Sequence, residues 1–135
     1  MAVRYLLDGD ICVYALSGRH PKVVRALDRR LPGQVTVSVI ALGELLAGAA
    51  KSSNAAAARQ RIAALTSVAD VLPLPPEAAE HYGNIRSELE RTGALIGPND
   101  LWIAAHAKAE GMTLVTNNVR EFKRVKGLKV VNWAA

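Results

Sequence analysis

Short, mostly apolar runs alternate along this chain with segments of helical periodicity, and few folds accommodate that alternation. The runs cover residues 3–7, 35–37, 71–74, 113–116 and 128–132. Each run is too short for a typical helix and is bounded by polar or turn-forming residues, which is typical of a buried strand. Apolar strands that alternate with helices form a parallel sheet covered on both faces. We therefore expect an α/β fold with a mostly parallel central sheet of four to five strands flanked by helices.

The helical segments are delimited by start and stop signals in the sequence. They cover residues 11–16, 21–31, 39–49, 55–68, 76–92, 98–110 and 119–125. Asp10, Ser38 and Asn54 are the expected N-caps of the first, third and fourth helices, because their short polar side chains accept hydrogen bonds from backbone N–H groups. Leu31 is expected on the inner face of the second helix. Pro73 cannot donate a ladder hydrogen bond, which places the third strand at a sheet edge.

The length and composition of the chain limit its domain organisation and location. With 135 residues, the chain is expected to form one domain, residues 1–135. No apolar stretch is long enough to span a bilayer, and the first residues lack the features of a signal peptide. The single cysteine, Cys12, forms no internal disulfide and suits a reducing compartment. We expect a cytoplasmic protein with no membrane partner.

Positive charge is concentrated in two segments of this chain, whose net charge is +5. The first segment holds Arg19, Lys22, Arg25, Arg29 and Arg30, and the second holds Arg120, Lys123, Arg124, Lys126 and Lys129. The part between them is less basic. Two basic clusters suit a polyanionic partner such as a nucleic acid, whose phosphates attract Lys and Arg. From charge alone, solvated helix faces explain these clusters equally well.

Acidic residues from distant segments are expected at one edge of the sheet. In a parallel sheet the carboxyl ends of the strands and the first turns of the following helices meet at the same edge. Residues at or near such positions are Asp8, Glu44, Asp100 and the turn that contains Asn118 and Glu121. Asp100 follows Pro98 in a first helical turn, where negative charge is favoured. Their joint placement therefore predicts a site.

Each of these residues also has a structural interpretation. Asp8 would be a helix cap, but Asp10 is better placed for that role, so we interpret Asp8 as a site residue. Asp100 and Glu121 are also explained as first-turn residues that interact with the helix dipole. Glu44 is typical of an exposed helix face, and Asn118 is common in turns. No single position identifies the site.

Gathered carboxylates favour a bound divalent cation. The carboxylates repel one another, and a cation relieves that repulsion. Hard oxygen ligands that leave room for water and phosphate suit Mg²⁺, with Mn²⁺ able to substitute. Such an ion acidifies a bound water and stabilises in-line displacement at phosphorus. An acidic metal pocket on a basic protein therefore predicts cleavage of a nucleic-acid backbone.

Four stretches of the sequence resemble PIN-domain ribonucleases of the VapC type, the toxins of bacterial toxin–antitoxin pairs. These stretches are residues 5–12, 38–45, 96–107 and 114–122. The last two resemble the branch that cuts initiator tRNA in its anticodon stem-loop. The resemblance spans nearly the whole chain and implies a PIN-like single domain.

The resemblance also implies roles for individual residues. Asp8 and Asp100 match the principal metal ligands of the family, and Glu44 matches its third acidic residue. Asn118 stands where most relatives carry Asp, and Glu121 would act there instead. The resemblance further implies Mg²⁺-dependent endoribonuclease activity on RNA, and the branch implies that the RNA is tRNA. It also implies a homodimer and inhibition by a cognate VapB-like antitoxin. Gly9-Asp10 departs from the usual Thr or Ser followed by Asn.

Two alternatives remain open at this stage. The first is a catalytically degenerate PIN domain that binds only RNA or its antitoxin, which the departures at Asp10 and Asn118 suggest. The second is a haloacid-dehalogenase-type phosphatase with Asp8 as nucleophile and Asp10 as general acid. That class needs a later lysine and a paired acidic motif, whereas Glu121 is the only acidic residue after Asn117.

Overall fold

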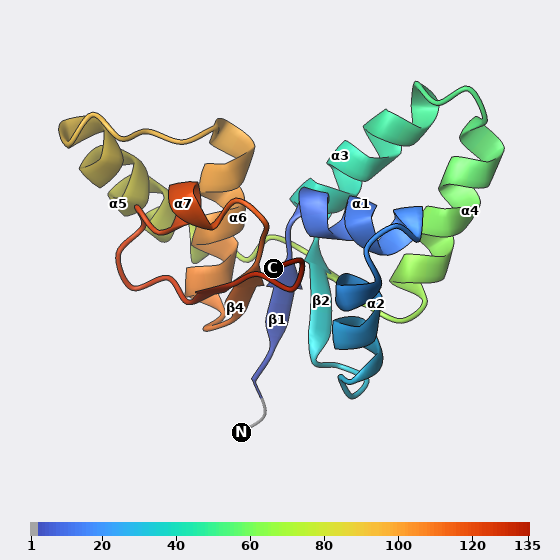
Figure 1. Ribbon diagram of the computed structural model, residues 1–135. Coiled ribbons are helices and arrows are strands. Elements are labelled where there is room, and N and C mark those ends of the chain that lie inside the picture. Colours follow the sequence, from blue (N-terminus) through green and yellow to red (C-terminus); the bar gives the residue numbers. More distant parts are fainter. Residues whose placement is uncertain (1–2) are drawn as a thin grey trace.

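One five-stranded sheet organises the computed structural model, which describes residues 3–135 (Figure 1). The strands are β1 (Tyr5–Leu7), β2 (Val35–Ser38), β3 (Asp70–Leu72), β4 (Thr113–Val115) and β5 (Val130–Val131). Their order is β3-β2-β1-β4-β5, and each neighbouring pair is parallel. The expected α/β fold with a parallel central sheet is therefore confirmed.

Helices fill the connections between successive strands. They are α1 (Gly9–Ser17), α2 (Pro21–Asp28), α3 (Val39–Ala50), α4 (Ala55–Thr66), α5 (Ala78–Arg91), α6 (Pro98–Ala109) and α7 (Val119–Phe122). In the view of Figure 1, α1 to α4 are drawn towards the right of the central strands, and α5 to α7 are drawn to their left. Within residues 3–135, no helix combines the length and the apolar character needed to cross a lipid bilayer.

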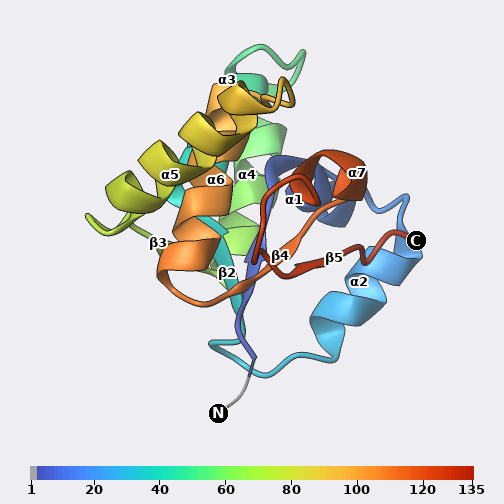
Figure 2. The same cartoon turned by 90° about the vertical axis from the view of Figure 1, so that its left-hand side faces the viewer.

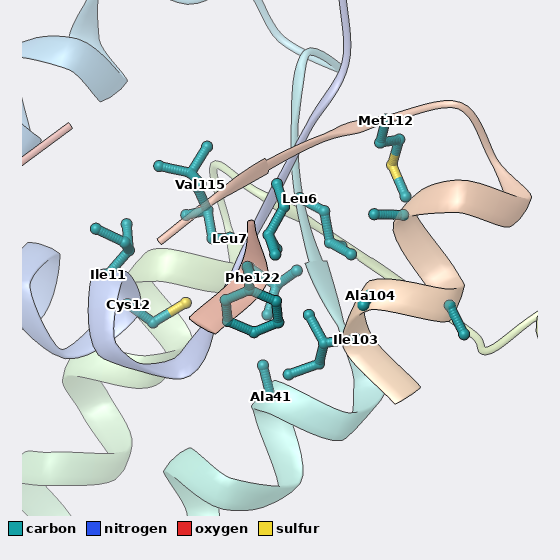
Figure 3. Packing of buried hydrophobic residues seen from close by; sticks show 14 of the residues in the cluster. Leu6, Leu7, Ile11, Cys12, Ala41, Ile103, Ala104, Met112, Val115 and Phe122 are labelled. Atoms are coloured by element: carbon teal, nitrogen blue, oxygen red, sulfur yellow. The ribbon is translucent and has the colours of Figure 1, made fainter. Parts of the chain in front are cut away.

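The core surrounds the central strand β1. Leu6 and Leu7 are both 0% exposed, although successive strand residues point to opposite faces of a sheet. Both faces are therefore covered, as the unbroken apolar character of this strand predicts. Figure 3 shows Phe122 of α7 and Ile103 of α6 among the buried side chains that surround β1. This packing fixes the end of β1, and with it the position of Asp8.

Several sequence signals mark the element boundaries correctly. Ser38 Oγ accepts a hydrogen bond from the Ile40 N–H at 3.1 Å and caps α3. Asn54 Oδ1 accepts one from the Ala57 N–H at 3.1 Å and caps α4. Strand β3 lies at a sheet edge, as Pro73 predicts, although it covers Asp70–Leu72 rather than residues 71–74.

Other boundaries differ from the expectation. Helix α2 ends at Asp28 rather than at residue 31, and Leu31 is 69% exposed rather than on the inner face. Helix α7 ends at Phe122 rather than at residue 125, and α5 begins at Ala78 rather than at residue 76. Phe122 and Val125 are both buried although only Phe122 is helical, because a turn after α7 carries Val125 back to the core. Apolar spacing alone does not locate such an end.

Candidate functional site

Asp8 connects the end of β1 to the start of α1. It is 4% exposed, and its Oδ1 atom accepts a hydrogen bond from the Ile11 N–H at 2.9 Å. Asp8 is therefore the N-cap of α1, and the prediction that Asp10 holds this position was wrong. The reason is that α1 begins immediately after the strand, at Gly9, which places Asp10 inside the first turn. The cap bond occupies one carboxylate oxygen, so a cap and a site residue are compatible roles for Asp8.

Burial and neighbouring charges make ionisation of Asp8 costly. The pKa of Asp8 is raised from 3.8 to about 6, chiefly by burial and to a smaller extent by the charges of Asp10 and Asp100. Hydrogen bonds from the Thr116 hydroxyl and the Ile11 N–H lower this pKa, but they do not offset the burial. The Asp8 carboxylate is thus held in a place where a positive charge would stabilise it.

Asp100 lies in the first turn of α6, two residues after Pro98. Its pKa is raised from 3.8 to about 6, chiefly by burial and to a smaller extent by the charges of Glu121, Glu44 and Asp10. Its Oδ2 atom lies 3.8 Å from the position that a Cβ atom on Gly97 would occupy. The glycine before this helix therefore leaves the space beside the carboxylate open.

Glu44 reaches the same region from α3. Its Oε1 atom lies 3.8 Å from the position of a Cβ atom on Gly9, at the start of α1. The side chain is exposed, and its charge contributes to the raised pKa of Asp100. Helices α1, α3 and α6 begin at the same end of the sheet, drawn at the top of Figure 1. The expectation that parallel topology gathers Asp8, Glu44 and Asp100 thus agrees with this geometry.

The turn after β4 contributes unequally to this site. Glu121 is half-buried in α7, and its charge acts on Asp100. Asn118 is the N-cap residue of α7, but its side chain forms no cap bond. Its backbone N–H donates to the Thr116 hydroxyl oxygen at 2.9 Å. The structure therefore places Glu121 in the electrostatic cluster, whereas Asn118 contributes a backbone contact.

Thr116 is expected at this edge from its position after the fourth strand, but the sequence indicates no role for it in a metal site. It is 0% exposed at the end of β4, where its hydroxyl bonds to Asp8 and accepts from the Asn118 N–H. It thereby links the ends of β1 and β4. The available signal was a hydroxyl residue that follows an apolar strand and precedes two asparagines.

The donor chemistry of this edge suits a hard divalent cation. Five carboxylates form the cluster, which consists of Asp8, Asp10, Glu44, Asp100 and Glu121. None of the ion pairs within residues 3–135 includes any of them. Within that same part of the chain, no three acidic, histidine or cysteine side chains lie close enough together to hold one ion. The charge and ligand type fit Mg²⁺, and binding would require the side chains to draw together.

A cavity of about 370 Å³ opens beside the acidic cluster, between α1, α3 and α4. Asp10 and Glu44 line the end of this cavity at the cluster, Val13 and Leu45 line its apolar wall, and Arg61 adds a positive charge. This cavity therefore gives access to the carboxylates of Asp10 and Glu44.

The family model for the PIN domain matches residues 5–128 of this chain. The chain belongs to the PIN-domain family. This PIN domain is 40% identical over 135 residues to Ribonuclease VapC2 of Haemophilus influenzae, covering 97% of this chain and 98% of the relative. It is 39% identical over 132 residues to the tRNA(fMet)-specific endonuclease VapC of Shigella flexneri, covering 98% and 99%. The resemblance found in the sequence is thereby confirmed.

Solved structures agree with the fold of this PIN domain. The structure of VapBC2 from Rickettsia felis bound to a promoter DNA fragment contains a chain that matches with a TM-score of 0.90 and 36% identity, covering 97% of this chain and 99% of that one. VapBC-1 from nontypeable Haemophilus influenzae matches with a TM-score of 0.90 and 34% identity, covering 98% and 100%. VapC nucleases with PIN domains are generally dependent on a divalent metal.

Proposed function

We propose that this PIN domain is the toxin of a type II toxin–antitoxin pair and hydrolyses RNA phosphodiester bonds with Mg²⁺, for which Mn²⁺ substitutes. The observation that carries this proposal is the cluster of carboxylates from four separate segments, which no basic side chain in residues 3–135 neutralises. The ribonuclease and endonuclease names of its relatives support the reaction class. The initiator tRNA anticodon stem-loop is the proposed substrate, supported by the name of the Shigella flexneri relative.

In this mechanism Asp8 and Asp100, with Glu44, hold the cation. When bound, the ion would acidify a water and stabilise negative charge on the phosphate under attack. Asp8 keeps a fixed orientation because it caps α1 and accepts a hydrogen bond from Thr116. Glu121 and Asn118 lie at the other side of the site, where Glu121 adds negative charge near Asp100. The carboxylates must be ionised to bind the ion, so the protein must release their protons first.

The partners follow from the same proposal. We propose that a VapB-like antitoxin inhibits this protein, since the matching solved structures are VapBC assemblies. A homodimer is also proposed, because the resemblance to the VapC type implies one. We also propose that residues 1–135 form a single PIN domain that acts in the cytoplasm, where its RNA substrate occurs. The buried, free thiol of Cys12 is compatible with a reducing compartment.

Cleavage of purified tRNA tests the proposed function. The protein should cut tRNA in the presence of Mg²⁺ and stop when EDTA removes the ion. Asp100→Asn should lower the cleavage rate at least about 100-fold while the protein remains folded, because it removes one charged ligand. The matched control Asp70→Asn changes an exposed aspartate at the start of β3 and should cleave normally. Equal cleavage by Asp100→Asn and the control would contradict the metal site.

One alternative function retains a supporting observation. The absence of three closely grouped metal ligands within residues 3–135 favours a domain that binds RNA or antitoxin without cutting. Binding of tRNA with no cleavage at any tested concentration of Mg²⁺ or Mn²⁺ would establish this alternative. The phosphatase alternative is dropped, because the chain belongs to the PIN-domain family.

A further inference from the structure

A second cavity, of about 320 Å³, lies beside α2 at the opposite end of β1 from Asp8. Four basic residues and one aromatic residue line it, together with two alanines: Lys22, Arg25, Arg29, Arg30 and Trp133. Figure 2 shows the end of the chain next to α2. The Arg30 guanidinium also packs over Tyr5, which begins β1. Tyr5 precedes Asp8 by three residues, or about 10 Å of strand. This cavity is therefore separate from the acidic cluster.

The positive charges of this cavity have no ion-pair partner among the acidic side chains of residues 3–135. No acidic side chain lines it, and its four basic residues take part in none of the ion pairs within residues 3–135. Lys22, Arg25 and Arg29 are spaced by three and four residues, so they occupy one face of α2. Like charges at this spacing repel one another and do not help the helix to form. An anion in the cavity would relieve that repulsion.

Arg30 is held in place by aromatic rings. Its guanidinium carbon lies 4.9 Å from the centre of the Tyr5 ring and 5.1 Å from the centre of the Trp133 ring. Those two rings are themselves in contact, with centroids 5.1 Å apart. The Nε atom of Arg30 is buried and has no hydrogen-bond partner. The rings therefore orient this cation at the wall of the cavity.

The second basic segment of the sequence differs from the first in this respect. Arg124 donates to the backbone carbonyls of Ala94 and Leu95, at 3.3 and 3.5 Å. Lys126 pairs with Glu88 at 3.4 Å. Two of its cations thus hold the loop after α7 against neighbouring parts of the fold. The α2 segment has the stronger case for a ligand.

We propose that the α2 cavity anchors RNA at a point away from the bond that is cut, which rests on the proposed ribonuclease function. RNA phosphates would contact Arg25, Arg29 and Lys22, and the partly exposed indole of Trp133 would stack on an unpaired base. The acidic cluster repels phosphate when no cation is bound, so affinity for RNA must come from elsewhere on the surface. A folded RNA with a single-stranded loop fits an anchor and a separate cutting site.

The test measures tRNA binding apart from cleavage. Fluorescently labelled tRNA is titrated with the Asp100→Asn protein in EDTA, at several salt concentrations. Adding Arg25→Gln and Arg29→Gln should weaken binding at least about fivefold and reduce the slope of log K against log salt by about 1.5, as expected for two lost phosphate contacts. Circular dichroism should show an unchanged fold, because both side chains are exposed on α2.

A matched control carries Lys51→Gln and Arg59→Gln, which remove the same charge from exposed positions near and within α4. This control should bind tRNA as tightly as its parent. Equal binding losses in the two double variants would overturn the anchor and leave only a general charge effect. Normal tRNA binding by the α2 variant, with lost binding of an acidic peptide, would assign the cavity to a protein partner instead. Because binding is read without cleavage, neither result depends on whether the wild-type protein cuts tRNA.

Discussion

Replacing Asp8 by Asn should stabilise the protein in the absence of a metal ion, although Asp8 is the proposed principal ligand. Asn is among the best N-cap residues, so its side-chain oxygen can still accept from the Ile11 N–H. What the substitution removes is a buried negative charge near Asp10 and Asp100. The pKa of Asp8 is about 6 in the folded protein against 3.8 for an unperturbed aspartate. That difference corresponds to roughly 3 kcal/mol in the free energy of unfolding at pH 7.

The sign of this effect depends on pH. Because the folded protein holds the Asp8 proton more tightly than the unfolded chain, the stability of the wild-type protein decreases as pH rises from about 4 to about 6. Above that range the penalty is constant, and below pH 4 it is absent. We expect Asp8→Asn to raise the free energy of unfolding by about 1–3 kcal/mol at pH 7 and by almost nothing at pH 4, since burial of the amide offsets part of the gain.

Urea unfolding at both pH values, with and without Mg²⁺, measures these differences. Mg²⁺ should stabilise the wild-type protein and have little effect on Asp8→Asn, because a ligand that binds only the folded state shifts unfolding by mass action. Asp70→Asn, at an exposed position, should stay within about 0.5 kcal/mol of the wild type. A less stable Asp8→Asn protein at pH 7, or an equal gain at pH 4, would refute the electrostatic account of the site.

Three further changes test other parts of the structure. Thr116→Val removes the hydroxyl that forms hydrogen bonds with Asp8 and the Asn118 N–H, and should lower the free energy of unfolding by about 1–3 kcal/mol in a urea titration. An unchanged urea midpoint would mean that these hydrogen bonds contribute little to stability. Phe122→Ala should cost about 3–5 kcal/mol, because this side chain is 1% exposed in the core, and a loss below 1 kcal/mol would contradict that packing. The rate of RNA cleavage at subsaturating Mg²⁺ should rise between about pH 5 and 7, because Asp8 and Asp100, each with a pKa of about 6, lose their protons in this range. A cleavage rate that does not change with pH would contradict their role as ligands.

Much of the fold was predictable because the strands are short and mostly apolar. Such runs have few alternatives to a covered parallel sheet, and parallel topology then brings the carboxyl ends of the strands together. The positions of Asp8, Glu44 and Asp100 in the sequence therefore predict that they lie at one edge of the sheet. It also indicated Pro73 as the mark of an edge strand, which the sheet order confirms.

The features that the sequence did not reveal depend on local backbone geometry or on tertiary contacts. Asp8 and Asp10 are both suitable caps, and the choice between them depends on how sharply the chain turns after β1. In the sequence, Thr116 looks like an ordinary strand residue. Its role depends on a hydrogen bond with Asp8, which follows a strand far away in the sequence. The two basic segments are alike in composition, and the contacts of Arg30, Arg124 and Lys126 separate them.

The central position of β1 has a consequence for the synthesis of this protein. Tyr5 in β1 pairs with Val35 in β2 and with Thr113 in β4, so one neighbour emerges early from the ribosome and the other emerges near the end of translation. Contacts between such distant segments form slowly and late in folding. Asp8 therefore meets Thr116 and Asp100 only when almost the whole chain has been made. An incomplete nascent chain would lack the assembled acidic edge, and so the proposed nuclease activity would be absent until synthesis is nearly finished.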